Sequence, residues 1–123
     1  MLCGDFSHEF LLTFLAEFFN PDHGKIKTNV VICRNSEPTA EMKEILNKSK
    51  YSGFIRYIKG DSILPHDLKR CLVNKAVSCL IMCDQSSTNN GQKQDYRNIL
   101  TAFAVKKYSA MMLNKENQDD SKN

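Results

Sequence analysis

The stretch from Phe54 to Leu68, FIRYIKGDSILPHDL, decides the fold that the sequence predicts. Its first part, Phe54 to Ile58, is a short apolar segment typical of a buried strand. Gly60 and Asp61 follow as a turn, since glycine adopts backbone conformations that other residues resist. Pro65 then opens a helix, because proline fits a first helical turn, where no intrahelical N–H bond is lost. A strand that leads directly into a helix is half of a βαβ unit.

The other apolar blocks repeat this alternation of strand and helix. Strands are predicted at Met1–Gly4, Ile26–Cys33 and Ala76–Cys83, in addition to Phe54–Ile58. Continuous apolar runs such as Val30–Cys33 are typical of strands buried on both faces, which belong to parallel sheets. Helices are predicted at Phe6–Phe19, Ser36–Lys48, Pro65–Val73 and Asp95–Lys107. The sequence therefore predicts an α/β fold, a doubly wound parallel sheet with right-handed crossovers.

The first predicted helix has a clear start and a clear inner face. Ser7 is a plausible N-cap, and Glu9 brings negative charge to the first turn, where the helix dipole favours it. Apolar residues recur at helical spacing and predict a core face rather than a ligand-binding one: Phe10, Leu11, Phe14, Leu15, Phe18 and Phe19.

Both ends of the predicted fold look truncated. A first strand at Met1–Gly4 is short for a sheet, and the chain stops after a helix where a further strand is expected. We expect residues 1–110 to form the domain. Residues 111–123 are mostly polar and are expected to be a disordered tail.

Composition excludes several classes of protein. A chain of 123 residues with 41% hydrophobic and 25% charged residues is typical of one globular domain. The net charge of +3, from 17 basic and 14 acidic residues, is too small and too scattered to predict a nucleic-acid partner. No apolar run approaches the ~18 to 20 residues that span a bilayer, so direct membrane insertion is not expected. The start also lacks the basic and apolar regions of a signal peptide.

The five cysteines are predicted to be reduced and mostly buried. Their odd number and the absence of CxxC spacing argue against a disulfide framework, and no histidine stands at zinc-knuckle spacing. Most of them lie in apolar runs, where cysteine behaves as a small apolar residue in a reducing compartment. They are Cys3, Cys33, Cys71, Cys79 and Cys83.

The first strand–helix turn departs from a dinucleotide site. Such sites need GxGxxG, but here Gly4 is the only glycine, and Asp5 places a carboxylate where phosphates would lie. The acidic residue that binds ribose after the second strand is replaced by Arg34 and Asn35. The residues therefore predict a nucleotide-type fold that binds no cofactor. The alternative is a truncated nucleotide-binding domain of an oxidoreductase or of a ligand-sensing regulator.

Three carboxylates are candidates for a ligand-binding face. Asp5 follows the first predicted strand, and Asp61 and Asp67 flank the turn after Phe54–Ile58. Ligands of such folds bind at the carboxyl ends of the strands. Asp61 and Asp67 could bind a cation or a basic side chain of a partner, or serve only as a turn residue and a first-turn acid. The histidines are far apart in the sequence and lack a catalytic motif, so no enzyme is predicted. They are His8, His23 and His66.

Three blocks of sequence resemble a known family. They are Gly60–Leu68, Ala76–Met82 and Arg97–Ile99. Together they resemble the first RCK (regulator of potassium conductance) domain of Slo-type channels, above all the large-conductance calcium-activated potassium channels. The resemblance extends to about Tyr108, and the PHDL block after the glycine turn is its most specific part.

This resemblance implies a Rossmann-like lobe of a cytoplasmic gating ring. The expected partners are other RCK domains in a tetrameric ring and the pore domain of the parent channel. The chain would be soluble itself, and would lie at the cytoplasmic face of the membrane as part of a multi-pass potassium channel. The helix Asp95–Lys107 corresponds to one that packs against neighbouring RCK domains, so Ile99, Phe103 and Tyr108 are the expected interface residues.

The resemblance also implies calcium as the ligand of the parent channel. The calcium-binding aspartate of the family lies between the first helix and the second strand, and its aligned position falls near Lys27. Asp22 is the only carboxylate in that loop and is the candidate metal ligand. Arg34 and Arg56 lie near the family's magnesium positions. Basic side chains oppose the binding of divalent cations, which select oxygen ligands.

Overall fold

The computed structural model describes residues 1–25, 27–83 and 91–122, and contains a four-stranded parallel sheet. The strand order is β3-β2-β1-β4, so the first strand lies inside the sheet. The strands are β1 (Leu2–Gly4), β2 (Val30–Arg34), β3 (Ile55–Lys59) and β4 (Leu80–Met82). This arrangement confirms the predicted α/β fold.

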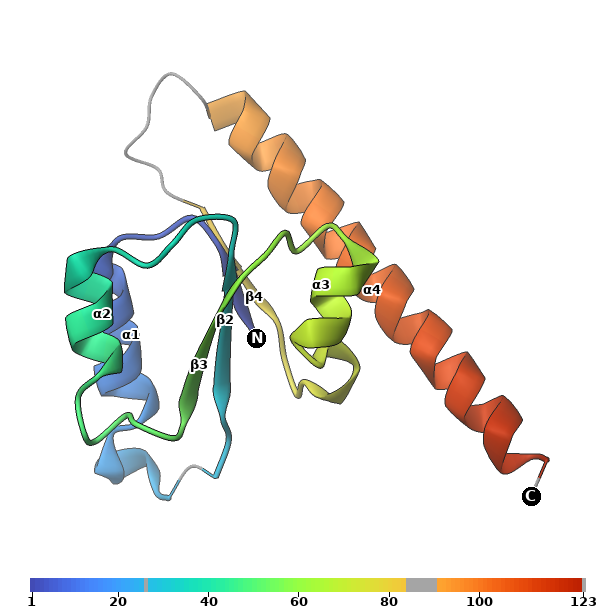
Figure 1. Cartoon of the computed structure of the whole chain (residues 1–123), viewed down its shortest axis with the longest axis horizontal. Helices are drawn as coiled ribbons and strands as arrows, with labels where there is room; N and C mark the ends of the chain where they lie inside the picture. Colours follow the sequence, from blue (N-terminus) through green and yellow to red (C-terminus); the bar gives the residue numbers. More distant parts are fainter. Residues whose placement is uncertain (26, 84–90, 123) are drawn as a thin grey trace.

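Helices cover both faces of the sheet (Figure 1). On one face lie α1 (His8–Phe18) and α2 (Ala40–Leu46), and on the other lie α3 (Pro65–Arg70) and α4 (Gly91–Asp120). Two short 3₁₀ turns, η1 (Pro21–His23) and η2 (Val73–Lys75), follow α1 and α3.

The core beneath α1 and α2 is large and aromatic at its margin. Leu11 and Leu15 are fully buried against the sheet. The rings of Phe10, Phe14 and Phe18 stack along α1 with centroids 6.0 and 5.5 Å apart. The predicted inner face of this helix is thereby confirmed, with the phenylalanines half-buried beside the leucines.

The core on the α3 and α4 side is built from smaller residues. Cys3, Cys33 and Cys71 pack with Ile58 directly on the sheet. Leu68, Val73 and Tyr108 form a separate cluster between α3, η2 and α4. All five cysteines are free thiols, as predicted, and Cys79 and Cys83 are half-buried.

Local chemistry explains where several elements begin. The Ser7 hydroxyl accepts a hydrogen bond from the Phe10 amide at 3.2 Å, which confirms the predicted N-cap of α1. The second helix begins at Ala40 rather than Ser36, because Thr39 caps it and Pro38 disfavours a helical residue before it.

Two predicted strands are shorter in the structure. β2 begins at Val30, not at residue 26, which lies outside the described residues. β4 begins at Leu80 rather than Ala76, after η2, which ends at Lys75. That turn follows Leu72, whose left-handed backbone (φ 52°, ψ 43°) ends the α3 segment before Val73.

The fourth helix corrects the expectation for the end of the chain. Residues 111–120, predicted as part of a disordered tail, instead continue α4 to Asp120. Tyr108 and Met112 pack toward α3, and Glu116 forms an ion pair with Lys75 at 3.1 Å. Polar residues that favour helices thus extend a segment anchored by apolar contacts. Most of the polar loop predicted at 84–93 lies outside the described residues.

Candidate functional site

The carboxyl ends of the strands open into a cavity of about 600 Å³, the edge pocket. Gly4 and Asp5 after β1, Arg34 after β2 and Gly60 after β3 line it. The first turns of α4, up to Thr101, close the opposite side. The pocket therefore occupies the position at which folds of this class bind their ligands.

The turn after β1 requires glycine and is closed by an ion pair. Gly4 has φ +97°, and a Cβ there would collide with the carbonyl of Met82. The Asp5 carboxylate accepts a hydrogen bond from the Arg34 guanidinium at 2.8 Å. The same guanidinium lies 4.8 Å from the centroid of the Phe6 ring. Side chains of the chain itself thus contact one another where a dinucleotide phosphate would lie.

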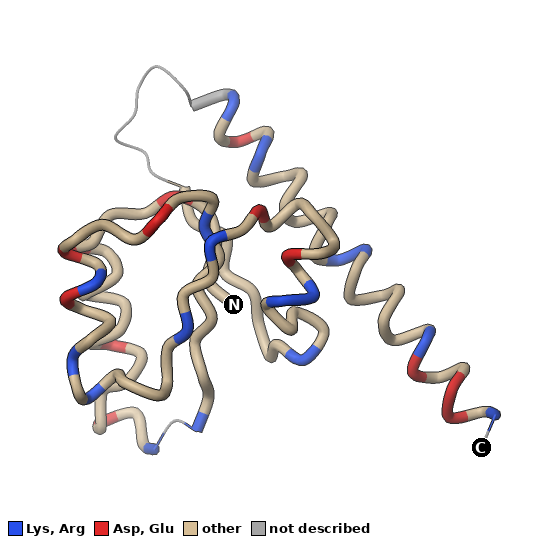
Figure 2. The backbone as a smooth tube through the Cα atoms, in the orientation of Figure 1, with Lys and Arg blue, Asp and Glu red and all other residues tan. Residues whose placement is uncertain are grey.

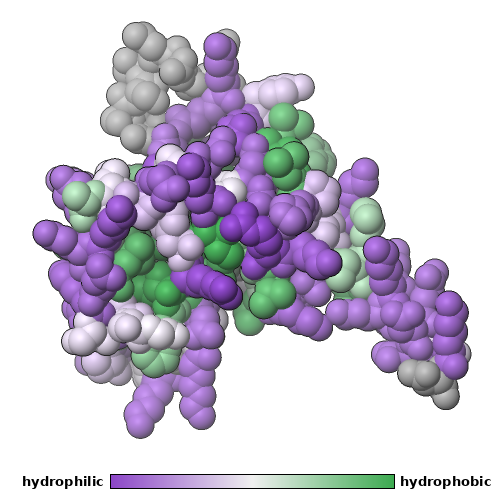
Figure 3. Space-filling view, in the orientation of Figure 1, coloured by the Kyte–Doolittle hydropathy of each residue, from purple (hydrophilic) through white to green (hydrophobic). Residues whose placement is uncertain are grey.

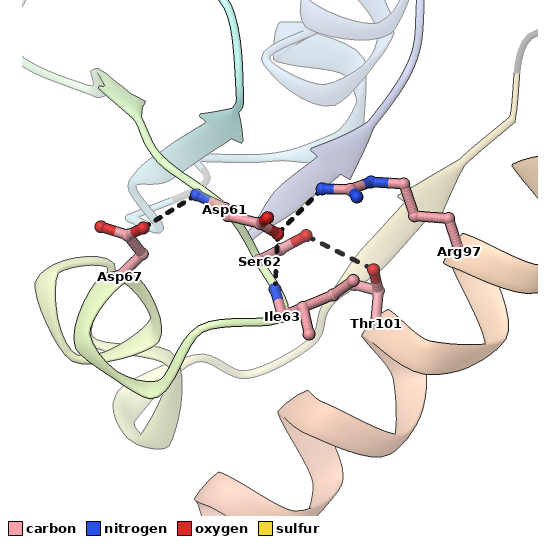
Figure 4. Close-up of polar contacts among 6 residues, drawn as sticks. All are labelled: Asp61, Ser62, Ile63, Asp67, Arg97 and Thr101. Carbon is pink, nitrogen blue, oxygen red and sulfur yellow. Dashed lines mark hydrogen bonds and ion pairs between the residues drawn. The ribbon is translucent and has the colours of Figure 1, made fainter.

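Asp67 holds the turn after β3 together (Figure 4). Its carboxylate accepts hydrogen bonds from the Asp61 amide at 2.9 Å and from Arg70 at 2.8 Å. These two donors hold the pKa of Asp67 below its usual range, the Asp61 amide contributing most. Only 8% of Asp67 is exposed, and a Cβ at Gly60 would come within 2.8 Å of its carboxyl carbon. The sequence GDSILPHDL therefore encodes a clamp between a turn and a helix.

The same turn is tied to α4. The Asp61 carboxylate accepts hydrogen bonds from the Ile63 amide at 3.0 Å and from Arg97 at 2.9 Å. One residue further, the hydroxyls of Ser62 and Thr101 lie 3.5 Å apart in a buried contact (Figure 4). Sequence reasoning found Asp61 but missed Arg97 and Thr101 as its connection to α4. The signal was present, because Arg97 stands in a block of the family resemblance.

The outward side of α4 is apolar. Tyr96, Ile99, Leu100 and Phe103 recur at helical spacing and are exposed; we call them the α4 stripe. Figure 3 shows apolar surface along the first half of this helix. Ile99 and Phe103, expected as interface residues, are 54% and 67% exposed. Tyr108 differs from that expectation, since it is 8% exposed and packs against Leu68.

The candidate calcium ligand lies apart from the edge pocket. Asp22 is exposed in η1, where its amide donates to the Asn20 side chain at 3.0 Å. Lys27 follows it in the chain and is also exposed. Within the described ranges, no group of three or more His, Cys, Asp or Glu side chains is arranged to hold a metal ion. His8, His23 and His66 are all exposed and come from separate elements.

Charge is interspersed over the molecule. Lys and Arg alternate with Asp and Glu on both sides of the sheet and along α4 (Figure 2). In the part of the chain that the structure describes, no helix is long and apolar enough to span a bilayer.

Comparison with known proteins assigns this arrangement to a family. The model of the calcium-activated potassium channel slowpoke-like RCK domain matches residues 1–120. Potassium channel subfamily U member 1 of Macaca fascicularis and of Homo sapiens are each 26% identical over 110 residues. The match covers 89% of this chain but only 9% of each channel. The chain therefore belongs to the slowpoke-like RCK domain family.

Proposed function

We propose that this chain acts as a regulatory, non-enzymatic domain of a calcium-activated potassium channel. In this proposal it assembles with other RCK domains into a tetrameric gating ring at the cytoplasmic face of the membrane. Binding of an intracellular ligand to the ring shifts its conformation and thereby opens the pore domain of the parent channel.

The α4 stripe is the observation on which the proposal rests. α4 uses its opposite side for contacts within the chain, through Tyr108 and the buried Thr101. Phe103 and Ile99 remain exposed, and exposed apolar groups of this kind mark sites of protein association. A second RCK domain is the partner that the family membership favours.

The contacts between the sheet edge and α4 provide a route for coupling. Asp61 and Ser62 join the turn after β3 to Arg97 and Thr101. The α4 stripe begins on the same helical turns. A ligand that moved the turn would therefore displace the helix that meets the neighbouring domain.

The assembly surface can be tested by sedimentation velocity on the 123-residue chain. We expect the wild-type chain to self-associate and Phe103→Glu, alone or with Ile99→Glu, to shift it to monomer. Leu113→Glu is the matched control, since Leu113 is 58% exposed on the same helix but lies outside the α4 stripe. A monomeric wild-type chain, or equal dissociation by Leu113→Glu, would contradict the proposed surface.

Coupling to the pore needs the whole channel. Residues 1–110 can replace the matching segment of the human channel, and potassium currents can be recorded as cytoplasmic calcium is raised. We expect calcium-dependent opening that Asp61→Ala weakens. Asp22→Ala tests the candidate ligand of this chain, and calcium responses unchanged by that substitution would remove Asp22 from the proposal.

Calorimetry with NAD separates this function from the alternative of a nucleotide-binding domain. We expect no binding, because the ion pair of Asp5 and Arg34 occupies the phosphate position. Tight binding of NAD would favour the alternative.

A further inference from the structure

Four thiols form a continuous row on the α3 side of the sheet. Cys3 and Cys33 are partners across β1 and β2, and therefore lie side by side on one face. Cys71 is buried in the same apolar cluster as this pair, and Cys79 packs against the margin of that cluster. We call Cys79, Cys3, Cys33 and Cys71 the thiol row.

Burial distinguishes Cys79 from the other three thiols. Cys33 and Cys71 are both buried within the cluster that contains Ile58. Cys3 is buried too, whereas Cys79 is half-buried and lies outside β4, at the margin of the cluster. A small oxidant in solution therefore reaches the thiol row at Cys79 first.

The ionisation of Cys79 suits such a reaction. The contact with the Cys3 thiol lowers the pKa of Cys79 to about 7, although burial opposes this. The same contact raises the pKa of Cys3. Because the thiolate is the nucleophilic form of cysteine, Cys79 is the reactive member and Cys3 keeps its proton near neutral pH.

We propose that Cys79 and Cys3 form an oxidisable dithiol that hydrogen peroxide converts into a disulfide between β1 and the segment entering β4. The two thiols supply the two electrons, and the peroxide is reduced to two molecules of water. This oxidation is independent of the proposed gating function.

The reaction proceeds in two balanced steps. The Cys79 thiolate attacks one oxygen of the peroxide, the O–O bond breaks, and the departing hydroxide takes up a proton as water. This leaves a sulfenic acid on Cys79. The Cys3 sulfur then attacks the sulfenic sulfur, the S–O bond breaks, and the released hydroxide takes the Cys3 proton to form the second water.

Closing the disulfide requires a local movement of the backbone. Cys3 pairs with Ile81 in the β1–β4 ladder, so Cys79 is its diagonal neighbour on the same face. Diagonal neighbours in sheets are roughly 7 to 8 Å apart, whereas disulfides hold Cα atoms within about 7 Å. Cys79 lies before β4, and the residues on either side of it are hydrogen-bonded to Met1, through the Ser78 carbonyl at 2.8 Å and the Leu80 amide at 2.8 Å. Closing the disulfide therefore shifts the start of β4 toward Cys3 and away from these two bonds.

The experiment is peroxide treatment of the folded 123-residue chain, followed by alkylation and mass mapping. Before alkylation, the intact mass should be lower by two hydrogen atoms. Mapping after alkylation should show a disulfide-linked peptide pair containing Cys3 and Cys79. Cys3→Ala should prevent the bond and leave a sulfenic acid on Cys79 that dimedone traps. Cys79→Ser should abolish both products.

Cys71→Ser and Cys83→Ser are the controls. Cys71 belongs to the buried pair, and Cys83 is half-buried like Cys79 but lies within hydrogen-bonding distance of Asp95. Both variants should form the Cys3–Cys79 disulfide as the wild type does. The proposal is overturned if the folded wild type resists peroxide, if the mapped bond joins Cys33 to Cys71, or if Cys83 oxidises before Cys79. Circular dichroism before treatment ensures that only folded protein is compared.

Discussion

The cores on the two faces of the sheet are built from different kinds of side chain. Beneath α1 and α2, long apolar side chains such as Leu11 and Leu15 fill the space, and a ladder of phenylalanine rings borders them. Beneath α3 and α4, the filling consists of cysteines and a small cluster around Leu68. Polar contacts, such as that between Asp61 and Arg97, supply much of the connection there.

The difference shows which part of the chain leaves apolar side chains exposed for a partner protein. The α1/α2 face uses its large residues internally, whereas α4 turns Phe103 outward and contacts the sheet edge through Arg97 and Thr101. We infer that the first face provides most of the stability and the second provides the contacts of the proposed function. Five measurements test this contrast.

The largest effect is expected at the centre of the α1/α2 face. Leu15→Ala should lower the free energy of unfolding by about 3 to 4 kcal/mol, because a fully buried leucine leaves a cavity. Urea unfolding followed by circular dichroism measures it. Leu12→Ala, on the exposed side of the same helix, is the control and should cost less than about 1 kcal/mol.

On the opposite face, replacement of Asp67 should lower the free energy of unfolding by nearly as much. Asp67→Ala removes a buried carboxylate that accepts from the Asp61 amide and from Arg70, and should cost about 2 to 3 kcal/mol. The exposed Asp22→Ala serves as control in the same urea titration. If both substitutions were equally mild, the turn after β3 would not depend on the clamp.

The contribution of Asp67 to stability should decrease as the pH falls. The folded state lowers the pKa of Asp67, so the unfolded state binds more protons as the pH falls. The contribution of Asp67 is therefore complete above the unfolded pKa of about 4 and is lost as the pH falls through the folded value. Unfolding curves between pH 3 and 6, about that pKa, should show a smaller acid-dependent loss in Asp67→Asn than in the wild type. Parallel curves would contradict this role.

Removal of one buried hydroxyl on the α1/α2 side should increase the stability of the fold. Tyr51 is almost fully buried, and among the described residues its hydroxyl has no hydrogen-bond partner. Tyr51→Phe should raise the free energy of unfolding by about 1 kcal/mol, since an unsatisfied buried group is removed. Tyr57→Phe is the matched control and should lose about 1 kcal/mol, because the Tyr57 hydroxyl donates to the Ser36 carbonyl at 2.7 Å. Thermal melts compare the two.

The smallest change in stability is expected on the α4 stripe. Phe103→Ser should alter the free energy of unfolding of the monomer by no more than about 0.5 kcal/mol, because this ring is exposed. Urea titration at low protein concentration tests it. A cost comparable to that of Leu15→Ala would mean that Phe103 packs within its own chain.

Local patterns were enough to predict the architecture. The apolar run ending at Cys33 predicted a strand buried on both faces, and β2 is an inner strand with a parallel neighbour on each side. Ser7 predicted the start of α1 because an N-cap depends on residues next to one another. Asp5 and Asp61 follow β1 and β3, whereas Asp67 lies in the first turn of α3. The ligand role of all three stays a prediction.

The features that the sequence did not predict depend on contacts between residues far apart in the chain. Nothing near Tyr108 in the sequence shows which side of α4 meets Leu68, so its burial could not be foreseen. The length of α4 was missed for the same reason, since its polar end is anchored by Lys75 from another element. The pairing of Asp5 with Arg34 likewise arises only once β1 and β2 lie side by side.

The inner position of β1 has a consequence for the order of folding. The amino group of Met1 donates to the Ser78 carbonyl at 2.8 Å across a sequence separation of 77 residues. The pairing of β2 with β3 spans a much shorter loop and is entropically easier to close. Long-range pairing raises contact order and slows folding. We therefore expect the pairing of β1 with β4 to form late and slowly, and the edge of β1 to stay unpaired until then.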